Sequence, residues 1–316
     1  MSNISLPLSY TLRAATRAEA QAIAEVIIAS DIAELGAAEY SVEDVLDDWK
    51  RAGFTLETDA QVAVTTEGQV VGYGYVWERD PGVQYQADGY THPEYEGRGI
   101  GTQMVRWMEA RARQMLAHRP HDQPAHLIHY VHHPNEAARA LFECKGFRPA
   151  RYAWRMLIEM DTSPPAPQWP AGIQVRTFFP GEERQMHAVV QEAFGDLEDF
   201  TPMPFETWAQ LTFENHDFDP SLYFVAQAGK EIAGLALGFK WPEMGWIRHL
   251  AVRRPWRRQG LGLALLRHAF GEFYRRGERK VGLGVDSENA TGATRLYHRA
   301  GMTVAQQFDQ YRKELE

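Results

Sequence analysis

The hydrophobic pattern of the second half of the chain alternates between short apolar runs and longer amphipathic ones. Residues 250–252 form an apolar run typical of a buried strand, and the run from 261 to about 274 has the spacing of an amphipathic helix. Strands are predicted near 173–177, 222–228, 231–239, 246–252 and 281–285, and helices at 259–275 and 290–300. This alternation predicts an α/β fold, of the α+β kind with a mixed sheet.

The first half of the chain repeats the pattern of the second. Gly99 and Gly260 occupy equivalent places, as do Gly146 and Gly301, at an offset of about 160 residues. That spacing is too long for a solenoid and suits two copies of one domain. Each copy is expected to run strand, two helices, several strands, helix, strand, helix and a terminal hairpin.

A proline-rich segment separates the two copies. Residues 161–172 contain four prolines, which predicts a semi-rigid linker. The expected domains are therefore an N-terminal domain at 1–160 and a C-terminal domain at 173–316, joined by this linker.

Composition narrows the classes of protein that fit. Of 316 residues, 44% are hydrophobic and the formal net charge is −9, which suits packed domains and argues against nucleic acid as the main partner. Cys144 is the only cysteine, so no disulfide forms within the chain and a reducing compartment is expected. The first residues lack the pattern of a secretion signal, and no apolar run reaches membrane-spanning length. These features predict a cytoplasmic protein without a membrane partner, as a monomer or homodimer.

A basic turn that contains glycines joins the strand near 246–252 to the helix that follows. A turn of this composition leaves several backbone N–H groups unpaired at a helix start, which is an anion site suited to a pyrophosphate. The turn lacks the Lys-Ser/Thr of a P-loop and the glycine spacing of a dinucleotide site. A solvated or nucleic-acid-binding arginine patch is the alternative, but it leaves Gly260 and Gly262 unexplained.

The turn resembles the Arg/Gln-x-x-Gly-x-Gly/Ala loop of the GNAT acetyltransferase superfamily, here Arg257-Arg-Gln-Gly-Leu-Gly262. In that family the loop holds the pyrophosphate of acetyl-CoA. The resemblance extends over both halves, so it implies two tandem GNAT folds that use acetyl-CoA as co-substrate and need no metal. The tandem layout most resembles the mycothiol synthase-like double-domain members of the family.

The resemblance also implies roles for residues of the second half. The Leu250 N–H would polarise the acetyl carbonyl, and Tyr297 would be the general acid that protonates the thiolate. The implied acetyl-CoA-binding residues are Leu250, Ala251, Val252, Arg257, Arg258, Gln259, Gly260, Leu261, Gly262 and Asn289. Two alternatives stay open: Tyr297 as a helix-packing residue, and Asn289 as a helix N-cap.

The first copy departs from the family pattern at the functional positions. Glu96 stands where the loop Arg or Gln is expected and brings a negative charge toward phosphates. Phe142 replaces the tyrosine and has no proton to donate, while Gly97, Gly99 and Gly101 still allow the turn. The first copy is therefore expected to be degenerate and structural, and the second catalytic.

Four histidines of the first copy are candidate metal ligands. On a strand, His126 and His132 fall on one face, and His129 and His133 on the other. Their spacing does not match chelating ligands on a helix or a zinc finger. We therefore expect structural histidines and no metal.

The acceptor is indicated by the segment after the first helix of the second copy. Acids between Glu192 and Asp219 alternate with aromatic residues, which suits a cationic, partly apolar amine; an ordinary acidic surface is the alternative. Many relatives place a Glu where this chain has Trp246, so the general base stays open. The candidates are Glu243, Glu198 and Glu214.

Together these features predict an acetyl-CoA-dependent N-acetyltransferase that acts on a small, cationic primary amine through the C-terminal domain. Two alternatives remain: mycothiol synthase-type acetylation of a cysteinyl-sugar amine, and a non-catalytic acetyl-CoA-binding module.

Overall fold

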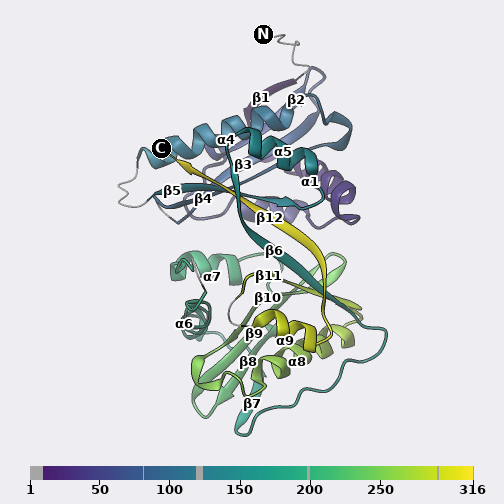
Figure 1. The fold of residues 1–316 in the computed structure, drawn as a ribbon, viewed down its shortest axis with the longest axis vertical. Helices are drawn as coiled ribbons and strands as arrows, with labels where there is room; N and C mark the ends of the chain where they lie inside the picture. The colour runs from purple at the N-terminus through teal and green to yellow at the C-terminus, as the bar shows by residue number, and fades with distance from the viewer. Residues whose placement is uncertain (1–9, 81, 119–123, 198–199, 290–291, 316) are drawn as a thin grey trace. The chain divides into compact units, whose positions relative to one another are not determined.

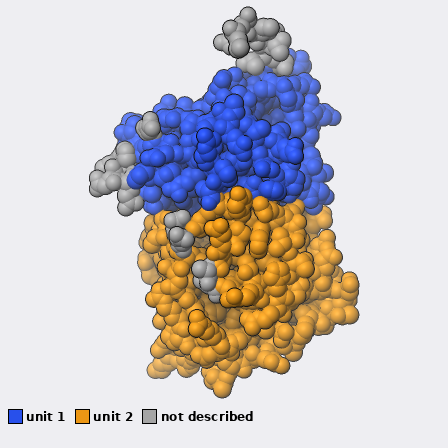
Figure 2. All heavy atoms as spheres, in the orientation of Figure 1, with its two compact units in different colours: residues 1–150, 309–316 blue, residues 151–308 orange. Residues whose placement is uncertain are grey.

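The structure is a computed structural model that describes residues 10–80, 82–118, 124–197, 200–289 and 292–315. The chain divides into unit 1, residues Met1–Ala150 and Asp309–Glu316, and unit 2, residues Arg151–Phe308 (Figure 2). Among the described residues, no helix is both long and apolar enough to span a bilayer.

Unit 2 is a mixed six-stranded sheet with two helices on each face (Figure 1). Its strand order is β6-β11-β10-β9-β8-β7; β10 and β11 are parallel, and the other pairs are antiparallel. In chain order the elements are β6 (Arg148–Glu159, in this unit from Arg151), β7 (Ile173–Thr177), α6 (Glu183–Phe194), α7 (Phe205–Phe213), β8 (Tyr223–Ala228), β9 (Glu231–Trp241), β10 (Met244–Val252), α8 (Leu261–Arg275), β11 (Lys280–Asp286) and α9 (Ala293–Arg299).

Two apolar clusters hold the helices of unit 2 on the sheet. Leu235, Leu237 and Trp208 belong to the cluster beneath α6 and α7, while Phe270 and Phe273 of α8 fill the cluster on the other face. Glycine lets α8 approach closely, because a Cβ at Gly245 would lie 2.4 Å from a ring carbon of Phe273. The end of α8 therefore packs on the start of β10, and at the other end a Cβ at Gly262 would lie 3.6 Å from Val252, which places the start of α8 beside the end of β10.

Unit 1 repeats this order, with one additional short helix before its second strand, which confirms the predicted duplication (Figure 1). Its strand order is β1-β2-β3-β4-β5-β12, with β4 and β5 parallel. Its elements are β1 (Tyr10–Ala14), α1 (Ala20–Leu35), α2 (Val42–Asp48), α3 (Leu56–Asp59), β2 (Ala60–Thr65), β3 (Val70–Asp80), β4 (Gln84–Thr91), α4 (Ile100–Leu116), β5 (Ala125–His132), α5 (Glu136–Cys144) and β12 (Thr303–Leu315, in this unit from Asp309).

The last strand of each copy continues into the other unit. The predicted terminal hairpin is absent: one uninterrupted strand, β6, follows α5, and one, β12, follows α9. Residues 153–159 of β6 pair with β11 in unit 2, and the end of β12 lies beside β5 in unit 1. The unit boundaries therefore differ from those expected at the linker, because strand pairing decides which unit a segment joins. Residues 161–172 form no helix or strand.

Candidate active site

The central strands of unit 2 separate toward one end of the sheet. β10 pairs with β11 only at Gly245 and Trp246, whereas its pairing with β9 continues to Val252. The edge of residues 247–252 that faces β11 therefore has no partner strand. A cavity of about 550 Å³ opens there, between the end of β10, the start of α8 and the helix α9.

The backbone of β10 presents donors to this cavity. The Arg253 N–H donates to the carbonyl of Ala233 in β9 at 3.0 Å. Because alternate residues of a strand direct their N–H groups to opposite edges, Leu250 and Val252 direct theirs away from β9, into the opening. Both residues line the cavity.

A β-bulge in β10 sends two consecutive side chains to the α6–α7 face. The register with β9 shifts between Ile247 and His249. Arg248 then donates to the carbonyl of Leu211 in α7, and the ring of His249 lies 5.7 Å from that of Phe194 in α6. Burial lowers the pKa of His249 to about 3, so this imidazole is neutral at physiological pH.

His249 was not among the residues singled out from the sequence. Its position directly before Leu250 was the available signal, but the bulge that turns it toward α6 leaves no clear mark in the sequence.

The turn after β10 has the same backbone conformation as its counterpart in unit 1. Arg258 and Gly260 have φ of +61° and +86°, and Gly97 and Gly99 have φ of +71° and +85°. Gly260 is the N-cap of α8 and offers no side chain, so the N–H groups of the first turn are left for a ligand. Among the described non-glycine residues, only Arg258 has a positive φ. The turn therefore forms in both copies, as predicted.

Three arginines of the turn hold it against the end of α6. Arg257 contacts Asp196 at 2.5 Å, the Ala193 carbonyl at 3.1 Å and the Val252 carbonyl at 3.0 Å. Arg254 also pairs with Asp196, at 2.5 Å, and Arg253 pairs with Glu192 at 2.7 Å. These arginines hold the pKa of Asp196 well below its usual range, through hydrogen bonds from Arg254 and Arg257. The guanidinium of Arg257 therefore positions the turn.

Arg258 differs from these three arginines. Its side chain is exposed and lines the cavity, and it makes no ion pair with the described residues.

Most of the predicted site residues meet at this one cavity. Those that line it are Leu250, Val252, Arg257, Arg258, Gly260, Leu261, Gly262, Asn289 and Tyr297. Ala251 does not, because its side chain is buried in the cluster beneath α6 and α7. Gln259 does not either; its side-chain amide donates to the Pro255 carbonyl at 2.8 Å.

Tyr297 and Asn289 reach the cavity from the segment after β11. Tyr297 is 8% exposed, and burial raises the pKa of its phenol to about 12. Asn289 lies in the turn that follows β11, and its N–H donates to the Asp286 carbonyl at 3.2 Å. The N-cap of α9 is Gly292, so the alternative of Asn289 as a helix N-cap is wrong.

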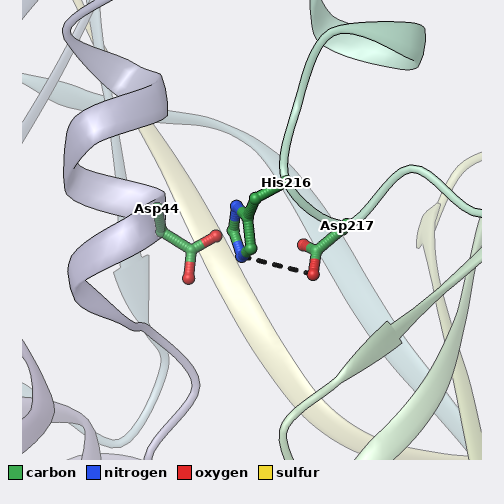
Figure 3. Close-up of side chains that lie close together, drawn as sticks. All are labelled: Asp44, His216 and Asp217. Carbon is green, nitrogen blue, oxygen red and sulfur yellow. Dashed lines mark ion pairs between the residues drawn. The ribbon is translucent and has the colours of Figure 1, made fainter.

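The acids predicted to attract a cationic acceptor are largely engaged with bases. Besides Glu192 and Asp196, Asp219 pairs with Arg276 at 2.6 Å, Glu206 with Arg184 at 3.4 Å, and Asp217 with His216 at 3.3 Å. Figure 3 shows the last of these pairs. Glu198 and Asp199 lie outside the described residues.

Two of the three base candidates are exposed. Glu243 is in the turn before β10, at the opposite end of that strand from Leu250, and Glu214 follows the last residue of α7. The third candidate, Glu198, is not described.

The matching cavity of unit 1 has different chemistry. It measures about 380 Å³ and is lined by Glu34, Glu96 and Phe142, with Gly89 in the place of Leu250. Burial raises the pKa of Glu34, and Glu96 adds to the effect. Phe142 packs 4.5 Å from the ring of His129 and donates no proton.

The histidines of β5, and His133 directly after it, have separate surroundings. His129 is buried, which lowers its pKa to about 3. His133 contacts Asp309 at 2.9 Å, and His126 contacts Arg312 at 2.9 Å. The three side chains therefore have different neighbours.

Known proteins resemble this chain over both copies. Residues 186–302 match the model of the acetyltransferase (GNAT) family, and residues 58–149 match the model of an acetyltransferase (GNAT) domain. The mycothiol acetyltransferase of Thermobispora bispora is 31% identical over 258 residues, which cover 74% of this chain and 77% of that protein.

Solved acetyltransferase structures also resemble this chain over nearly its whole length. A GCN5-related N-acetyltransferase from Sphaerobacter thermophilus has 39% identity and a TM-score of 0.82, with 99% of this chain and 98% of that chain covered. A tandem GNAT protein from the clavulanic acid biosynthesis pathway has 16% identity and a TM-score of 0.71, with 97% and 99% covered, which shows a shared fold.

Proposed function

This chain belongs to the GNAT family of acetyl-CoA-dependent N-acetyltransferases, and we propose that unit 2 alone transfers the acetyl group. One observation carries the proposal. The free edge of β10, the turn at Gly260 and the phenol of Tyr297 border a single cavity of about 550 Å³. In unit 1, Glu96 and Phe142 take the places of Arg257 and Tyr297.

The turn and the strand edge supply donors for different parts of acetyl-CoA. The N–H groups at the start of α8 and the guanidinium of Arg258 bind the pyrophosphate. Val252 pairs with the amides of the pantetheine arm. Leu250 donates its N–H to the thioester oxygen, where negative charge develops as the amine nitrogen bonds to the carbonyl carbon.

Tyr297 donates a hydrogen bond to the sulfur as the carbon–sulfur bond breaks. With a pKa of about 12, this phenol is a weaker acid than a thiol, whose pKa is about 8.5. It therefore stabilises the developing thiolate without a full loss of its own proton. The acceptor nitrogen releases the proton that the thiolate finally holds, so the products are the acetamide and free CoA thiol.

The pH dependence of the reaction tests these roles. We expect kcat/KM to rise as the acceptor ammonium loses its proton and then to stay level to about pH 10. His249, whose pKa is about 3, is neutral throughout this range, and Tyr297, whose pKa is about 12, stays protonated. A pH–rate profile over two acceptors of different amine pKa measures this. A descending limb below pH 10, or an ascending limb that does not follow the acceptor, would contradict the assignment.

For the acceptor, we propose the amine of a cysteinyl-sugar conjugate. Relatives named mycothiol acetyltransferase support this class, since the T. bispora protein is similar over most of both chains. The ion pairs of Glu192, Asp196 and Asp219 weaken the case for a cationic amine, because carboxylates already neutralised by arginine attract a second cation poorly. Attraction of a cationic amine then depends on Glu198 and Asp199, which the structure does not describe.

A thiol-release assay over a panel of amines separates the two acceptors. We expect the highest kcat/KM with the cysteinyl-sugar amine and a KM that changes little between about 0.05 and 0.5 M salt. Replacing Glu198 by Gln and Asp199 by Asn together should leave that KM unchanged. Preference for a diamine, with a KM that rises with salt and rises again in the double variant, would favour the cationic acceptor instead.

A further inference from the structure

One face of the β3–β4 ladder in unit 1 carries polar aromatic and acidic side chains. The directly opposed residues on this face are Tyr73 with Tyr90, Tyr75 with Asp88, and Trp77 with Gln86. In unit 2, the equivalent positions of β9 hold Leu235, Leu237 and Phe239, of which the two leucines belong to the core beneath α6 and α7. Where this face is apolar in unit 2, in unit 1 it therefore carries hydroxyls, an indole and a charge.

The other face of the same strands explains why unit 1 still folds. Gly72, Gly74 and Gly89 let α4 pack closely, because a Cβ at Gly74 would lie 2.6 Å from Met104. The side chains of Tyr85 and Ala87 join the apolar cluster beneath α4. This cluster supplies an apolar core that does not depend on the polar face, so the polar residues are free to serve another purpose.

The segment after α2 brings an ion pair to the polar face. Arg51 pairs with Asp48, and its guanidinium lies 4.9 Å from the Trp77 ring centre and 5.4 Å from that of Tyr75. Tyr40 also donates to Asp48. The charge of Arg51 is thus balanced within the cluster.

Two buried donors of this cluster have no acceptor among the described residues. They are the indole N–H of Trp77, a residue only 6% exposed, and the Nε–H of Arg51. A buried donor without a partner is costly, so such groups in folded proteins normally meet water or a ligand. Arg51 lies over the Trp77 ring, so the two donors belong to one cluster.

Asp88 is the carboxylate of this face that has no basic partner among the described residues. Its carboxylate accepts from the Tyr75 hydroxyl at 2.7 Å and from Gln86 at 3.4 Å, and no described base pairs with it. Its side chain is half-buried and so is that of Tyr90, whose pKa is raised by burial and by the charge of Asp88. A carboxylate beside two tyrosine rings is favourable for an ammonium group.

We propose that this polar face of unit 1 is a second ligand site, which binds a small monocation that carries a primary ammonium group and a neutral oxygen acceptor. The ammonium pairs with Asp88, and the oxygen accepts from Trp77 and Arg51. Asp88 has no base among the described residues, so a monocation neutralises its charge, whereas a zwitterion brings a second carboxylate beside it. The site lies outside the transfer machinery of unit 2 and does not rest on the proposed function.

Calorimetric titration of the full chain tests the site with four probes. Glycinamide and ethanolamine each carry an ammonium beside a carbonyl or a hydroxyl oxygen, and the stronger binder identifies the oxygen that the site prefers. Glycine keeps the ammonium but adds a negative charge, and N-acetylglycinamide lacks the positive charge. We expect these two to bind at least about tenfold more weakly. Equal binding of all four, or no binding of either amine, would overturn the proposal.

Two variants assign the binding to unit 1. Asp88→Asn should weaken glycinamide binding at least about tenfold, while the matched control Asp47→Asn, which removes a carboxylate paired with exposed Lys50, should not. Trp77→Phe keeps the ring, loses the N–H and should weaken binding about threefold or more even if Asp88→Asn fails to fold. Unchanged affinity in folded Asp88→Asn or in Trp77→Phe would refute this site and would leave acetyl transfer by unit 2 untouched.

Discussion

Gly260→Val is expected to reduce acetyl-CoA affinity by at least about a hundredfold. The residue has φ of +86°, a conformation that costs a β-branched residue about 1–2 kcal/mol or more. Relief of this strain turns the peptide groups around position 260, so the N–H groups at the start of α8 no longer point together at a phosphate. Loss of two charge-assisted hydrogen bonds of about 1.5–3 kcal/mol each accounts for the expected change.

Gly99→Val is the matched control. Gly99 has φ of +85° in the same turn of unit 1, so the two variants carry the same backbone strain and should lower the melting midpoint by similar amounts. Only Gly260→Val should lose acetyl-CoA binding by calorimetry, with one site per chain in the wild type. Equal losses in both variants, or two sites in the wild type, would contradict acetyl-CoA binding by unit 2 alone.

Tyr297→Phe should lower kcat about a hundredfold while acetyl-CoA affinity stays nearly unchanged. The variant removes the donor that stabilises the thiolate but keeps the ring that packs beside α8. Unit 1 already has a phenylalanine at this position: Phe142 packs 5.3 Å from Phe147. Stability should therefore change little. Steady-state kinetics with the best acceptor, together with a binding titration, separate the two effects.

Tyr274→Phe provides the comparison for the loss of a hydroxyl. Tyr274 packs against the same core from α8 but does not line the cavity, and its ring faces Arg279 at 4.0 Å. Its kcat should equal that of the wild type. If Tyr297→Phe also retains full turnover, Tyr297 has only a packing role and solvent protonates the thiolate.

The architecture of this protein could be predicted from the local pattern of apolar and polar residues. The strands predicted at 173–177, 222–228, 231–239 and 246–252 and the helix at 259–275 agree with the structure to within a few residues. The duplication and the glycine turn were equally visible, because periodicity and positive-φ glycines depend on neighbours in the chain. The same local evidence separated the two copies by Glu96 and Phe142.

Long-range pairing and packing were decided only in the folded chain. The exchange of β6 and β12 depends on which strand each one pairs with, and no sequence feature of either strand indicates that partner. The bulge that turns His249 toward α6 arises in the same way, from the register between β9 and β10. Arg257 lines the cavity, as do most residues expected at the pyrophosphate, but its contacts with Asp196 and Ala193 could not be predicted, because they depend on a helix far away in the chain.

The physical reason for this division is the range of the interactions. Strand, helix and turn preferences act over a few residues and can be read from spacing. Ion pairs, buried donors and strand edges act between segments far apart in the chain, so their partners exist only once the tertiary structure brings them together.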